Sequence, residues 1–144
     1  MFGRIVAAWD GSAVSLRAFE VAIGLARRDA SELTVVSVAH SPAHAETTGD
    51  REESAEAARR YLRETFAAAR DLAERAGVDP EHVVIDGDDP TDALLDHVHG
   101  HAVDLLVVGH HRSGRAGRLL LRGVPARLIE RSEVPVLVVT EPDR

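Results

Sequence analysis

The chain contains neither cysteine nor lysine among its 144 residues. The absence of cysteine excludes disulfides, thiol catalysis and thiolate metal sites, and it fits a reducing cytosol. All 17 Lys-plus-Arg side chains are arginines, so no lysine can form a Schiff base or act as the lysine of a phosphate-binding loop. We therefore expect no catalysis through a cysteine or lysine nucleophile.

Long apolar runs and an excess of positive charge are also missing. No run approaches the roughly 20 residues that a membrane-spanning helix needs, and the first ten residues lack the pattern of a cleavable signal. The net charge of −7 disfavours general binding to nucleic acid or to membrane surfaces. The length fits one domain over residues 1–144, so we expect a cytoplasmic protein that binds neither nucleic acid nor membrane.

Short apolar runs alternate along the chain with patterns typical of helices. Strands are expected at residues 4–9, 32–39, 82–85, 105–108 and 134–140. Helices are expected after Ser12, over about 52–76, from Pro90 to Gly100 and over 124–132, with a loop at 40–51. This alternation favours parallel strands with helices on both faces of the sheet.

The segment after the fourth expected strand is rich in glycine and arginine. Glycines stand at 109, 114, 117 and 123, and arginines at 112, 115, 118 and 122. Glycine lets a ligand approach the backbone amides, and arginine supplies permanently charged donors for phosphate or carboxylate. Because a helix follows, its N-terminus faces this segment, and we expect the segment to favour an anion.

Five short motifs, in this order and at these distances, resemble those of the universal stress proteins. They are DGS at 10–12, GDDP at 87–90, VVG at 107–109, RLLL at 118–121 and VPVLVV at 134–139. The resemblance implies an α/β fold of the adenine nucleotide alpha hydrolase-like kind, a doubly wound parallel sheet of five strands in the order 3-2-1-4-5 with four helices. Ligands of such sheets bind at the carboxyl ends of the strands where the winding reverses, which is where Asp10 and Gly109 fall.

ATP-binding members of this family carry the motif G-x2-G-x9-G-[S/T]. Here Gly109 keeps the first glycine, Arg112 and Arg122 replace the next two, and Gly123 replaces the Ser or Thr. The arginines either block the path of a triphosphate, bind its phosphates themselves, or form a solvated face that pairs with acidic residues. The resemblance implies a candidate site for ATP or AMP made of Asp10, Val38, Gly109, Arg112, Arg122, Gly123 and Val124.

Two residues at the end of the first expected strand have alternative interpretations. The aspartate that matches Asp10 in ATP-binding relatives contacts the nucleoside, whereas Asp is also common as a helix cap or a solvated loop acid. Trp9 either packs in the core or, if its ring leans toward the adenine pocket, stacks on a base or blocks it. Ser12 is a plausible N-cap for the first helix.

Histidines gather at 97, 99, 101, 110 and 111. His97 and His101 have the spacing of metal ligands on one helix face, but Gly100 lies between them near the helix end. Histidines at a helix C-terminus also interact favourably with the helix dipole. We favour this second interpretation, and we expect no metal site and no Ser-His-Asp triad.

Two functional hypotheses follow from the resemblance. The first is a dimeric stress-response or signalling module with unidentified protein partners, in which ATP binding is in doubt and turnover is at most that of a slow ATPase. The second is a nucleotide-binding switch that uses Asp10 and the 109–124 loop. In both, the apolar strand at 134–140 lies at the sheet edge, and we expect it to pair with its mate in a homodimer.

Overall fold

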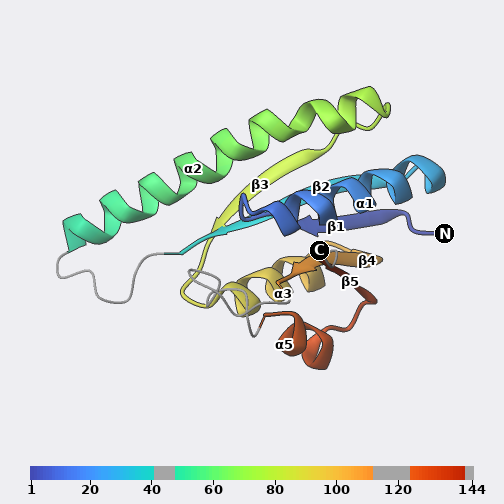
Figure 1. Ribbon diagram of the computed structural model, residues 1–144. Coiled ribbons are helices and arrows are strands. Elements are labelled where there is room, and N and C mark those ends of the chain that lie inside the picture. Colours follow the sequence, from blue (N-terminus) through green and yellow to red (C-terminus); the bar gives the residue numbers. More distant parts are fainter. Residues whose placement is uncertain (41–47, 112–123, 142–144) are drawn as a thin grey trace.

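The computed structural model describes residues 1–40, 48–111 and 124–141 (Figure 1). Within these ranges five strands and four helices follow one another as β1 Arg4–Ala8, α1 Ala13–Asp29, β2 Glu32–Ala39, α2 Thr48–Arg75, β3 Glu81–Asp86, α3 Pro90–Gly100, β4 Leu105–His110, α5 Val124–Arg131 and β5 Val136–Thr140. The strands are all parallel and lie in the order β3-β2-β1-β4-β5. The predicted topology is therefore confirmed.

The sheet separates two hydrophobic layers. Ile5 and Ala7 of β1 point into a layer that contains residues of α1 and α2, including Phe19 and Phe66. The alternate residue Val6 points into a second layer formed with α3 and α5. Because both faces are covered, the central strands are apolar throughout, as the sequence predicted.

The ends of four strands differ from the prediction by one or two residues. β1 ends at Ala8, one residue before Trp9, while β4 continues two residues past the predicted end, to His110. The predicted strand at 134–140 begins only at Val136, because the Ser132 hydroxyl donates to the carbonyl of Val134 and holds that residue in a turn. β3 is longer than predicted by one residue at each end.

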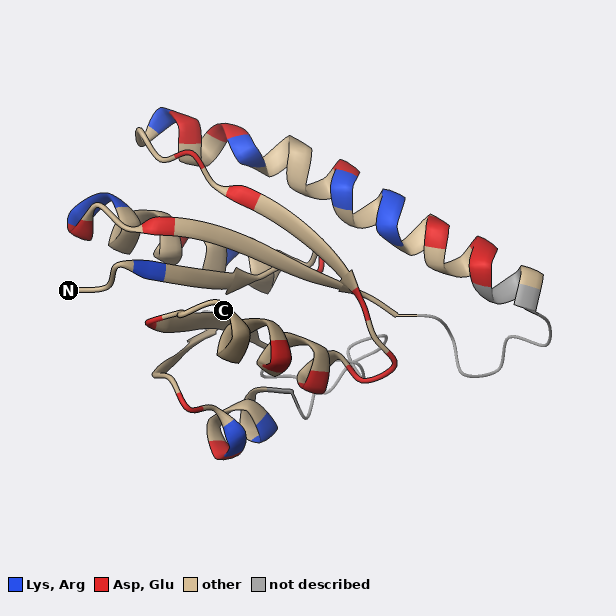
Figure 2. Cartoon of the chain, turned by 180° about the vertical axis from the view of Figure 1, so that it is seen from behind, with Lys and Arg blue, Asp and Glu red and all other residues tan. Residues whose placement is uncertain are grey.

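Helix α2 starts at Thr48, four residues earlier than predicted, so the helix begins inside the segment predicted as a loop. Its first turns extend beyond the edge of the sheet (Figure 1), so they need no apolar face, and the 3.6-residue pattern appears only further along. Acidic and basic residues are interspersed along its length (Figure 2). No helix in the described ranges is long and apolar enough to cross a membrane.

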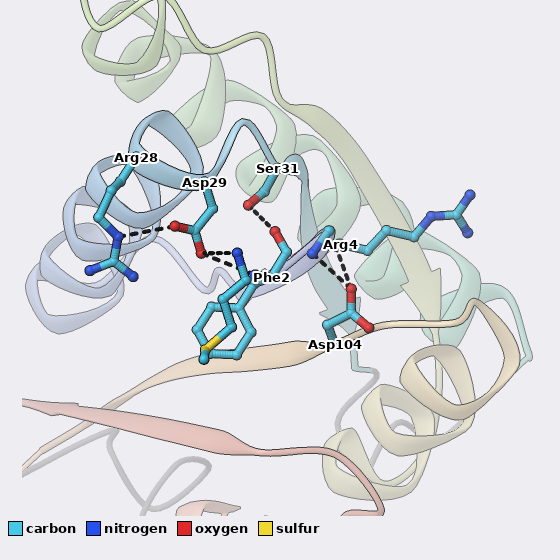
Figure 3. A network of polar contacts seen from close by, with 8 residues as sticks. Phe2, Arg4, Arg28, Asp29, Ser31 and Asp104 are labelled. Carbon is cyan, nitrogen blue, oxygen red and sulfur yellow. Dashed lines mark hydrogen bonds and ion pairs between the residues drawn. The ribbon is translucent and has the colours of Figure 1, made fainter.

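The amino end of β1 is fixed by two carboxylates (Figure 3). One oxygen of Asp104 accepts hydrogen bonds from the amides of Gly3 and Arg4, both at 2.9 Å. Asp29, at the end of α1, accepts from the amide of Phe2 at 3.0 Å. That amide, together with Arg28, holds the pKa of Asp29 below its ordinary value, so the charged carboxylate stabilises this end of the sheet.

At the opposite end, β1 and β4 separate. Their pairing stops at Ala7 and Val107, whereas β4 stays paired with β5 as far as His110 and Thr140. β1 instead remains with β2, since the Trp9 amide donates to the Val36 carbonyl at 2.9 Å. The divergence opens a crevice at the point where the winding of the sheet reverses.

Candidate functional site

A cavity of about 120 Å³ occupies this crevice between the carboxyl ends of β1 and β4. On the scale on which one water needs about 10–15 Å³, the cavity has room for several waters or for a small planar ring. Its walls come from the sheet and from the first turns of α1 and α3: Ala8, Trp9, Asp10, Val14, Ser15, Val36, Val38, His40, Pro90, Leu94, Val108 and Gly109. Apolar side chains dominate this set, and Asp10 carries its one carboxylate.

Asp10 serves the turn before α1 and also faces the cavity. Its Oδ1 accepts from the amide of Ser12 at 2.9 Å and from the Ser12 hydroxyl at 2.5 Å. The Ser12 hydroxyl accepts from the amide of Ser15 at 3.2 Å, which confirms Ser12 as the N-cap of α1. Both hydrogen bonds of Asp10 within the described residues use Oδ1, which leaves Oδ2 without a partner in that part of the chain.

Gly109 has a packing role that the sequence did not reveal. A Cβ at this position would lie 2.7 Å from the carbonyl oxygen of Val14, which belongs to the first turn of α1. The contact is with backbone, so α1 would have to move to accommodate a side chain. The glycine thus brings α1 against β4 and at the same time keeps the floor of the cavity open.

Trp9 packs in the core, which agrees with the first of its two interpretations. Only 5% of its surface is exposed, and its ring meets those of Phe19 and Phe66 edge-on at centroid distances of 6.0 and 5.6 Å. Its Nε1 donates to Thr65 Oγ1 of α2 at 3.1 Å. Trp9 contributes to the cavity wall, but its ring is held on the α2 side of the sheet, where it neither stacks on a ligand nor blocks it.

Asp89 occupies the N-terminus of α3 at the edge of the cavity. Its Oδ1 accepts from the amides of Thr91 and Asp92, and its Oδ2 accepts from Arg127 of α5 at 2.9 Å. Arg127 and these amides hold the pKa of Asp89 below its ordinary value. The positive end of α3 is therefore already neutralised by its own cap and does not offer free amides to a phosphate.

The structure places some of the predicted site residues together. Asp10, Val38 and Gly109 line one cavity, and Val124 is the first residue of α5. Arg112, Arg122 and Gly123 lie outside the described residues. The walls supplied by His40 and by the first turns of α1 and α3 were not predicted. The only signal for them in the sequence was the position of the strand ends.

The histidines of α3 lie at the other end of the molecule from this cavity. The rings of His97 and His101 stack with centroids 4.0 Å apart, and His101 Nδ1 lies 2.6 Å from the His97 carbonyl. Burial, and then His101, lower the pKa of His97. In the described part of the chain, no group of three or more His, Cys, Asp or Glu side chains is arranged to hold a metal ion.

Comparison with known proteins agrees with the topology. Residues 1–140 match the sequence profile of Usp, the universal stress protein family. The chain belongs to the universal stress protein family. It is similar to the universal stress protein MJ0531 of Methanocaldococcus jannaschii, with 30% identity over 148 residues that cover 100% of this chain and 85% of that protein.

Solved universal stress proteins share the fold. A universal stress protein crystallised in complex with cAMP is 29% identical, with a TM-score of 0.72 and coverage of 96% of this chain and 97% of the other. UspA of Lactobacillus plantarum superposes with a TM-score of 0.82, covering 95% and 97% of the two chains, at 18% identity. The adenine nucleotide alpha hydrolase-like architecture predicted for this chain is thereby established.

Proposed function

We propose that this universal stress protein is a signalling module that binds an adenine mononucleotide, with the base in the cavity between β1 and β4. The observation that carries the proposal is the cavity itself, which has apolar walls and, among the lining residues that the structure describes, one carboxylate. A planar base suits apolar walls, and the Asp10 carboxylate would accept a hydrogen bond from an amine or a ribose hydroxyl. The similar protein solved with cAMP supports this class of ligand.

A mononucleotide fits this chain better than ATP for two reasons. The amides at the start of α3 are already bound by Asp89. In addition, two glycines of the ATP motif are replaced by Arg112 and Arg122, which makes a close approach of the backbone to a triphosphate unfavourable. One phosphate needs fewer backbone contacts than three.

We propose a binding role in the cytosol without efficient turnover. Ser12 is the hydroxyl nearest to Asp10 in sequence, and it is engaged as a helix cap and hydrogen-bonded to that carboxylate. It has no histidine partner among the contacts of the described residues. If ATP does enter the site, slow hydrolysis is the most that this arrangement supports.

Calorimetric titration with AMP, cAMP, ATP and adenosine tests the proposal on the wild type and two variants. Ala8→Leu fills the cavity from β1, and Ala67→Leu places the same side chain on an exposed position of α2. We expect micromolar binding of AMP or cAMP, no tighter binding of ATP, and a loss of about tenfold or more, at least about 1.4 kcal/mol, only in Ala8→Leu. Failure of every nucleotide to bind at millimolar concentration would instead favour a protein-interaction module.

We also propose that two copies pair through β5. β5 lies at one edge of the sheet, its Leu137 is 37% exposed, and Ile129 of the preceding helix is 59% exposed. An exposed apolar edge strand is a liability unless it is paired, and a twofold pairing would satisfy its free backbone groups.

Light scattering coupled to size exclusion tests the pairing at micromolar concentration. We expect twice the chain mass for the wild type and for the control Ala67→Lys, and a shift toward the monomer for Leu137→Lys. A wild-type monomer would contradict the proposal.

A further inference from the structure

Tyr61 of α2 packs against the turn that carries Asp10. Gly11, the next residue in that turn, has φ of +84°, and a Cβ built on it would lie 2.9 Å from both Cε2 and Oη of Tyr61. The tyrosine ring therefore lies directly on the backbone of Gly11. Glycine is needed here twice, because L side chains rarely adopt this backbone conformation and because the ring leaves no room for a side chain.

Trp9, which precedes Asp10, is held by the same face of α2. Trp9 Nε1 donates to Thr65 Oγ1 at 3.1 Å, and Thr65 lies four residues after Tyr61, one turn further along α2. The Trp9 carbonyl accepts from the Ser37 hydroxyl at 2.7 Å. Asp10 is thus flanked by two contacts with α2, while its own carboxylate faces the cavity.

Tyr61 is much more exposed than the core residues beside it on α2. Leu62 and Phe66 are 6% and 1% exposed and join α2 to the sheet, whereas Tyr61 is 53% exposed. A half-exposed aromatic residue contributes little to the core. Its described contact is with the turn of the candidate site, which points to a role in that turn rather than in the stability of the fold.

We propose that Tyr61 is a positioning residue of the nucleotide site, which holds the Asp10–Gly11–Ser12 turn so that the Asp10 carboxylate meets the ligand. This inference rests on the proposed function. The proposal gives α2 an indirect role in binding, because Tyr61 positions the turn and α2 itself does not contact the ligand. Because binding linkage is reciprocal, a ligand on Asp10 also restrains the contact between the turn and α2.

The test compares Tyr61→Ala with Tyr61→Phe, which keeps the ring, and with Glu64→Ala, which removes an exposed side chain from the same turn of α2. Backbone amide exchange in the absence of ligand reports on the turn, since the Ser12 amide is hydrogen-bonded to Asp10. Titration with AMP reports on the site. We expect Tyr61→Ala alone to accelerate exchange at Ser12 by about fivefold or more and to weaken AMP binding by about five- to tenfold.

Three results would overturn the inference. These are unchanged exchange in the turn of Tyr61→Ala, faster exchange with unchanged AMP affinity, and faster exchange throughout α1 and β4, which would indicate global destabilisation. Absence of AMP binding to the wild type would defeat the proposed function and the role of Tyr61 in it. In that case the exchange data would still show separately whether the ring restrains the turn.

Discussion

The two ends of β1 are held in opposite ways. At the amino end, Asp104 and Asp29 bind three consecutive backbone amides, at residues 2 to 4. At the carboxyl end, β1 and β4 diverge around an apolar cavity. There, Thr91 Oγ1 and His110 Nδ1 are buried with no hydrogen-bond partner in the described ranges.

Under the proposed function, the amino end of β1 contributes to stability and the carboxyl end contributes to ligand binding. At the amino end, Asp104 and Asp29 fix the strand and line no part of the cavity. The carboxyl end gives up the pairing between β1 and β4, which is a cost that proteins accept mainly at functional sites. Substitutions at the two ends should therefore affect different quantities, and the predictions below use that difference.

The largest effect is expected at Gly109. Gly109→Ala forces a Cβ to within 2.7 Å of the Val14 carbonyl oxygen, and overpacking of this kind costs about 1–3 kcal/mol of unfolding free energy. Denaturant titration measures the loss, and AMP binding should weaken as α1 moves.

Gly24→Ala is the matched control for this substitution. Gly24 lies inside α1, and a Cβ there meets no atom within 4 Å. The change should stabilise the protein by about 0.5–1 kcal/mol, because alanine is the better helix former. Equal effects at the two glycines would contradict the packing role assigned to Gly109.

At the amino end, Asp104→Ala should lower stability without changing nucleotide affinity. The variant loses two hydrogen bonds to a charged acceptor at an exposed position, so we expect a cost of about 1 kcal/mol. Asp71→Ala, which removes a surface partner of Arg75 on α2, should cost close to nothing. Weaker AMP binding in Asp104→Ala would contradict the separate roles assigned to the two ends of β1.

An effect of similar size, but dependent on pH, is expected from His82 on the edge strand β3. Its Nε2 lies 3.0 Å from Ser37 Oγ, the hydroxyl that holds the Trp9 carbonyl. Burial, followed by Arg70 and Arg63, lowers the pKa of His82 from 6.5 to about 4. The unfolded chain then binds a proton that the folded chain does not, so stability is present above pH 6.5 and is lost as the pH falls toward 4.

Comparison with His82→Gln measures this contribution. Since His82 is partly exposed, we discount the shift for solvent screening and expect the wild type to lose about 1 kcal/mol more than the variant between pH 7 and pH 5. Parallel stability curves for the two proteins would show that His82 titrates in the same way folded and unfolded.

Much of the fold was predictable because the residue preferences of each segment agreed with the alternation of strands and helices along the chain. The apolar strands, the Ser12 cap and Pro90 at the start of α3 each follow from side-chain chemistry alone. The early start of α2 was not predictable from an apolar stripe, because that part of the helix lies beyond the edge of the sheet (Figure 1).

The site was only partly predictable. Asp10, Val38 and Gly109 followed from the family motifs and lie together. The walls from Val14 and Leu94, the contact of Tyr61 with Gly11 and the close approach of Gly109 to α1 depend on how helices pack across the sheet. Such contacts between residues distant in sequence leave no local pattern.

The most direct test of the central claim is a map of amide chemical-shift changes on titration with AMP. The account predicts saturable changes at the carboxyl ends of the strands, at Ala8, Val38 and Gly109, with Gly3 and Arg4 at the amino end unaffected. In Ala8→Leu, the changes at Val38 and Gly109 should disappear. Changes centred on the amino end, or no change at any residue at millimolar AMP, would contradict it.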